Sequence, residues 1–219
     1  MSRALTVICA SLLLLLGCSS TPPQRLAGYE QYQRTGGAAA YSRTLRAWTK
    51  ELRLYDRFET KLLMRAVFKS QRFRTAWSHE YARRNILPSE TYALLRERET
   101  DDAARFHEIL FAAWAGDSKG GHFIGDDAPW TIRLVGDDGR TVSPLLINRI
   151  KRPSTELLTL FPFITPHDRI FVAKFPVLAD DGTPLISEQS RDLTLQVAGV
   201  LARGEMVWPL RRPRDDSGS

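Results

Sequence analysis

Short apolar segments that alternate with polar residues recur along the second half of the chain, each followed by a turn rich in glycine or aspartate. The dipeptides Asp138-Gly139 and Asp181-Gly182 follow two of these segments, and Asp-Gly between alternating stretches is a strong β-hairpin signal. Gly204 stands between the last two and is expected in their turn. Short strands at regular spacing favour an antiparallel sandwich over a parallel α/β sheet. We predict strands at residues 130–135, 141–150, 169–177, 193–200 and 205–208.

The segment 48–69 is compatible with two periodicities. A helical period places Trp48, Leu52 and Tyr55 on one stripe, whereas a period of two alternates apolar and charged residues from Phe58 onward. We favour two strands, 48–55 and 59–68, that turn near Asp56-Arg57, and a further buried strand at 106–114.

Helical signals lie before and between these strands. Residues 38–48 carry Tyr41, Leu45 and Trp48 at helical spacing. Ser70 is placed to cap a helix that runs to residue 84, and Ser89 to cap a second one that continues to residue 102. The sequence therefore predicts a mostly β fold, an Ig-like antiparallel β-sandwich, α+β overall. It would form a single domain at 38–209 with a helical insertion at about 70–103 and a disordered tail at 210–219.

The N-terminal region has the features of an export signal. Arg3 precedes the apolar run Ala4–Leu16, which is too short to cross a bilayer of roughly 30 Å as a helix. The run ends in Leu15-Leu16-Gly17-Cys18, which resembles the lipobox of bacterial lipoproteins. The resemblance implies that residues 1–17 are a signal peptide removed after Gly17 and that Cys18 is acylated with fatty-acid chains such as palmitate. Residues 18–37 would then form a flexible tether.

The lipoprotein resemblance also implies a compartment. Ser19 follows the cysteine, which by analogy with Gram-negative lipoproteins favours the outer membrane, with the domain facing the periplasm. Cys9 would leave with the signal peptide and Cys18 would carry the lipid, so no free thiol is expected in the mature protein. The membrane is thus one expected partner, through the acyl chains, whereas nucleic acid is not expected.

The segment 116–127 contains the candidate catalytic residues. Its glycines have the separation of a phosphate-binding loop, but His122 stands where that motif requires lysine. His122, Asp126 and Asp127 could contribute to a hydrolase or transferase site. No histidine pair has the spacing of a zinc helix, and we predict neither a metal nor a cofactor.

Basic residues concentrate between positions 43 and 84, in a chain of formal net charge +6. Such a region could face an anionic membrane surface or polymer. The residues that we consider for this contact are Arg65, Lys69, Arg72 and Arg74.

We expect a non-catalytic role, in which the lipid-anchored protein binds or scaffolds an envelope protein or a cell-wall component. This expectation follows because the sequence shows no set of nucleophile, base and orienting group. Two alternatives stay open: an envelope hydrolase or transferase that uses the 116–127 loop, and a module that binds membrane surfaces or anionic polymers.

Overall fold

The computed structural model describes residues 37–116 and 121–211. The predicted signal peptide, Cys18 and nearly all of the predicted tether lie outside the described residues, as does the tail from residue 212.

The larger of two sheets has five antiparallel strands in the order β1-β2-β3-β7-β6. The pair predicted at 48–55 and 59–68 is confirmed, because alternate residues of the second strand (Leu62, Met64 and Ala66) are fully buried. The strand at 106–114 is confirmed too, and its apolar run is buried on both faces. The five strands are β1 Thr49–Asp56, β2 Glu59–Phe68, β3 Phe106–Trp114, β6 Leu146–Ile150 and β7 Arg169–Pro176.

The second sheet has four antiparallel strands in the order β5-β4-β8-β9. They are β4 Trp130–Gly136, β5 Thr141–Val142, β8 Asp192–Gly199 and β9 Arg203–Pro209. As predicted, the β4–β5 connection is a tight turn, with Gly139 at a φ of 86°.

Two details of the strand prediction were wrong. Residues 141–150 divide between the sheets, because Pro144 has no N–H to continue a ladder and the Leu145 N–H donates instead to Lys174 O of β7 at 2.8 Å. Gly204 does not lie in a turn but within β9, opposite Val197. A Cβ there would come within 2.7 Å of the Leu52 side chain, so the glycine permits close approach between the sheets.

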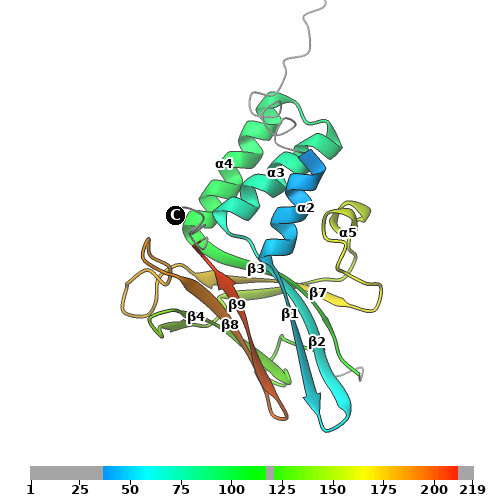
Figure 1. Cartoon of the computed structure of the whole chain (residues 1–219), viewed down its shortest axis with the longest axis vertical. Coiled ribbons are helices and arrows are strands. Elements are labelled where there is room, and N and C mark those ends of the chain that lie inside the picture. Colours follow the sequence, from blue (N-terminus) through cyan, green and yellow to red (C-terminus); the bar gives the residue numbers. More distant parts are fainter. Residues whose placement is uncertain (1–36, 117–120, 212–219) are drawn as a thin grey trace, which may run out of the picture.

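The helices of the described residues are α2 Gly37–Trp48, α3 Gln71–Asn85, α4 Ser89–Arg105 and α5 Thr155–Leu160. Side chains of α2, α3 and α5 pack against the outer face of the five-stranded sheet, whereas α4 packs mainly against α3. Figure 1 shows α2, α3 and α4 together at one end of the molecule. The predicted cap of α3 is confirmed, since Ser70 Oγ accepts a hydrogen bond from Phe73 N. The predicted cap of α4 is corrected: Pro88 precedes the helix, and Ser89 is its first residue.

The three layers enclose two apolar cores. One lies between the sheets and includes Phe111, Leu134 and Trp208; the other lies between the five-stranded sheet and the helices and includes Phe73 and Leu110. A mostly β fold of two antiparallel sheets with a helical insertion is therefore confirmed. The Ig-like type is not confirmed, because a helical layer covers one sheet and β5 and β6 join different sheets.

Candidate functional site

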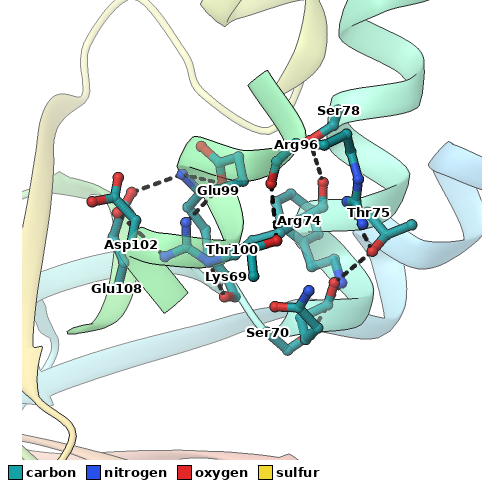
Figure 2. A network of polar contacts seen from close by, with 12 residues as sticks. Lys69, Ser70, Arg74, Thr75, Ser78, Arg96, Glu99, Thr100, Asp102 and Glu108 are labelled. Atoms are coloured by element: carbon teal, nitrogen blue, oxygen red, sulfur yellow. Dashed lines mark hydrogen bonds and ion pairs between the residues drawn. The ribbon is translucent and has the colours of Figure 1, made fainter. Parts of the chain in front are cut away.

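A buried ionic network joins the helical insertion to the five-stranded sheet (Figure 2). At its centre lies Arg74 of α3, whose side chain is 1% exposed. Its Nη1 donates to Glu99 Oε2 of α4 at 2.7 Å, and its Nη2 lies 3.4 Å from Glu108 Oε2 of β3. Its Nε donates to the backbone oxygen of Lys69 at 2.9 Å. One guanidinium thus connects α3 to α4, to β3 and to the residue that follows β2.

Lys69, just after β2, completes the network. Its Nζ donates to Glu108 Oε1 at 2.9 Å and lies 3.5 Å from Glu99 Oε2. Burial alone would raise the pKa of the Glu108 carboxyl, but the charges of Lys69 and Arg74 outweigh this and hold the pKa below its ordinary value. Two cations therefore balance two carboxylates in the protein interior.

This network corrects part of the predicted anionic-surface contact. Arg74 is buried and Lys69 is 12% exposed, and both side chains donate hydrogen bonds to acceptors inside the protein. Arg65 pairs with Glu51 at 2.9 Å and donates to the backbone oxygen of Phe163 at 2.8 Å. Of these four residues only Arg72 is exposed, and the other three are partly or fully buried.

A groove of about 900 Å³ lies beside the network. Its walls are formed by α2, the start of α3, the start of β3, the segment 186–190 and the end of β9. The site is therefore assembled from five separate parts of the chain.

Aromatic side chains form the floor of this groove. The Phe68 ring lies 5.8 Å from Trp48 and 6.1 Å from His107, as measured between ring centroids. Phe68 also contacts Trp208, whose Nε1 donates to the backbone oxygen of Trp48 at 2.8 Å. The floor is thus continuous with the core between the sheets and is fixed by it.

The charged groups around the groove are mostly basic. Arg43, Arg72 and Arg211 are exposed residues that line it, whereas Glu188 is the acidic residue of its lining. Arg211 donates to the backbone oxygen of Glu188, which fixes the end of β9 against the 186–190 segment. Within residues 37–116 and 121–211, neither Arg43 nor Arg72 forms an ion pair.

His107 lies between the groove and the network. Burial and the nearby Arg74 lower the pKa of its imidazole from 6.5 to about 4, so the ring is neutral at physiological pH. Its Nε2 is buried and has no hydrogen-bond partner among the described residues. The histidine therefore contributes an aromatic and weakly polar surface rather than a charge.

The sequence-predicted catalytic candidates do not form a site in the described residues. His122, Asp126 and Asp127 are all exposed, and within this part of the chain His122 has no hydrogen bond to either carboxylate. Residues 117–120 of the same predicted loop lie outside the described residues. The described residues also contain no group of three or more His, Cys, Asp or Glu side chains that could hold a metal ion.

Sequence reasoning missed the groove as a site, although it found two of its components. The cap at Ser70 marked the start of α3, and Arg72 was considered as an anionic contact. The convergence of α2, the end of β9 and the 186–190 segment around one groove is a product of tertiary structure, for which a single sequence gives no local signal.

No family model matches the chain, and no curated protein does. A search of solved structures finds a crystal structure described as a novel protein of unknown function from Burkholderia pseudomallei. The two chains are 10% identical, with a TM-score of 0.41, and the match covers 83% of this chain and 89% of that one. Among the helices that the structure describes, none has both the length and the apolar character needed to cross a bilayer.

Proposed function

We propose that this protein is a lipid-anchored envelope lipoprotein with a non-catalytic binding role, and that it holds its ligand or partner in the groove. The observation that carries the binding role is the groove itself, about 900 Å³ in volume, with an aromatic floor fixed by the core. Binding sites are commonly concave, preformed and largely apolar, with a few polar groups at the edge. The lipobox-like Leu15-Leu16-Gly17-Cys18 supports the lipid anchor, and Ser19 after the cysteine supports placement at the periplasmic face of the outer membrane.

Lipidation is expected to depend on the single side chain of Cys18. Cells grown with an alkyne-tagged fatty acid should incorporate the label into the wild-type protein, and Cys18→Ala should abolish labelling. Cys9→Ala is the matched control, because Cys9 would leave with the signal peptide, and it should be labelled normally. Equal labelling of wild type and Cys18→Ala would refute the anchor.

The binding role is tested by a photo-crosslinking amino acid at Gln71, an exposed residue of the groove wall. Irradiation of living cells should give a discrete adduct from this position, identified by mass spectrometry. The control is Asn148, which is exposed on β6 and does not line the groove. An adduct from Asn148 alone, or none from Gln71, would contradict binding in the groove.

A further inference from the structure

The charges and the floor of the groove define which ligands it can take. We infer that the groove binds an anionic amphiphile, a molecule with a phosphate- or carboxylate-type head and an apolar portion. The inference rests on the proposed binding role and gives the chemical class of the ligand.

The anionic head is assigned to the side of the groove formed by α2 and the start of α3. Arg43 and Arg72 line the groove there, and their guanidinium groups are not committed to carboxylates in the described residues. Guanidinium forms charge-assisted, bidentate hydrogen bonds to phosphate and carboxylate oxygens. The guanidinium groups of Arg43 and Arg72 are therefore available to bind an anionic group of a ligand.

The backbone at the start of α3 adds to this preference. Gln71 and Arg72 are its first two residues, and the first N–H groups of a helix have no intrahelical acceptor. The Ser70 side chain satisfies only the N–H of Phe73. The remaining N–H groups and the helix dipole favour negative charge at this end of the groove.

The apolar portion is assigned to the floor. Trp48, Phe68 and the neutral ring of His107 present aromatic surface there, and Ala47 of α2 lines the same groove. Lys69 also lines the groove, but its charge is already balanced by Glu108. A ligand that was only an ion would leave this apolar surface uncovered, and a ligand that was only apolar would leave the arginines unpaired.

The test is a calorimetric titration of the purified protein with three probes: dodecyl phosphate below its micelle concentration, dodecyl maltoside and inorganic phosphate. Dodecyl phosphate should bind at least about tenfold more tightly than either of the others, because it alone satisfies both parts of the groove. Equal binding of inorganic phosphate would overturn the apolar portion, and equal binding of dodecyl maltoside would overturn the anionic head.

Paired arginine variants test where the anionic head of the ligand binds. Arg43→Gln/Arg72→Gln should weaken dodecyl phosphate binding by about tenfold or more, since two charge-assisted contacts are removed. Arg46→Gln/Arg149→Gln removes the same charge from exposed positions outside the groove and should change the affinity less than about twofold. Equal weakening by both pairs would reduce the effect to overall charge and overturn the assigned site.

A separate variant tests the floor without removing a charge. Ala47→Phe places a ring in the groove from an exposed helical position, so the fold should tolerate it. It should weaken dodecyl phosphate binding and leave the unfolding temperature nearly unchanged. If the groove takes none of the probes while Gln71 still yields an adduct in cells, the ligand class is wrong and the binding role stands.

Discussion

Replacing Arg74 with methionine is expected to lower the free energy of unfolding by about 3–5 kcal/mol, the cost of breaking a buried ion pair from one side. Methionine fills a similar volume but removes the donors that Glu99 and Glu108 accept from. Two buried carboxylates would then share the single ammonium of Lys69. Urea denaturation followed by circular dichroism measures the loss.

A matched control separates burial from charge. Arg53 pairs with Glu51 at 2.5 Å, but their side chains are 58% and 36% exposed, so water screens the pair and Arg53→Met should lower the free energy of unfolding far less than Arg74→Met does. The double variant Arg74→Met/Glu99→Met removes one cation and one carboxylate together, and it should be more stable than Arg74→Met alone. Similar small losses for Arg74→Met and Arg53→Met would show that the network does not hold the helical layer.

Stability is expected to rise by roughly 3 kcal/mol between pH 4 and pH 6.5 on account of His107 alone, given its pKa of about 4 in the folded protein. In this window the unfolded chain binds a proton at the imidazole and the folded protein does not. The contribution is fully present above pH 6.5 and is lost as the pH falls towards 4. Burial is the main cause of the lowered pKa, and Arg74 adds to it.

The variant His107→Phe isolates this contribution, because it keeps an aromatic ring next to Phe68 and removes the titrating group. Chemical denaturation at pH 5, 6, 7 and 8 should give a shallower pH dependence for the variant than for the wild type. The pKa of Glu108 is also lowered, but its contribution is lost only below the ordinary value of 4.5, so measurements above pH 5 separate the two groups. Parallel profiles for variant and wild type would show that His107 titrates alike in both states.

Much of the fold could be predicted from local patterns. β2 was found because its apolar residues alternate and Leu62, Met64 and Ala66 face the core. α3 was found because Ser70 caps it. Even α5 has a serine cap, since Ser154 Oγ accepts a hydrogen bond from Leu157 N at 3.1 Å, but the helix is too short for a periodic pattern to indicate it.

The placement of charged residues could not be predicted in the same way. Arg72 and Arg74 are the same residue type two positions apart, yet Arg74 is buried and Arg72 is exposed. The difference depends on Glu99 and Glu108, which lie 25 and 34 residues further along the chain and meet Arg74 only after the insertion has folded onto the sheet. The groove could not be predicted for the same reason, because the residues that line it come from separate parts of the chain.

The contact between the first and last strands has a mechanical consequence. β1 and β9 are edge strands of different sheets that pack side by side, and no ladder of backbone hydrogen bonds is shared between them. This seam is held by the packing of Leu52 and Leu54 against Gly204 and by the hydrogen bond from Trp208 to Trp48. Separation of the sheets would therefore begin at this edge, under the floor of the groove. The groove is lined both by Trp48, next to β1, and by Pro209 at the end of β9. A ligand that contacts both residues would connect the two sides of the seam, so its binding should slow the separation of the two sheets.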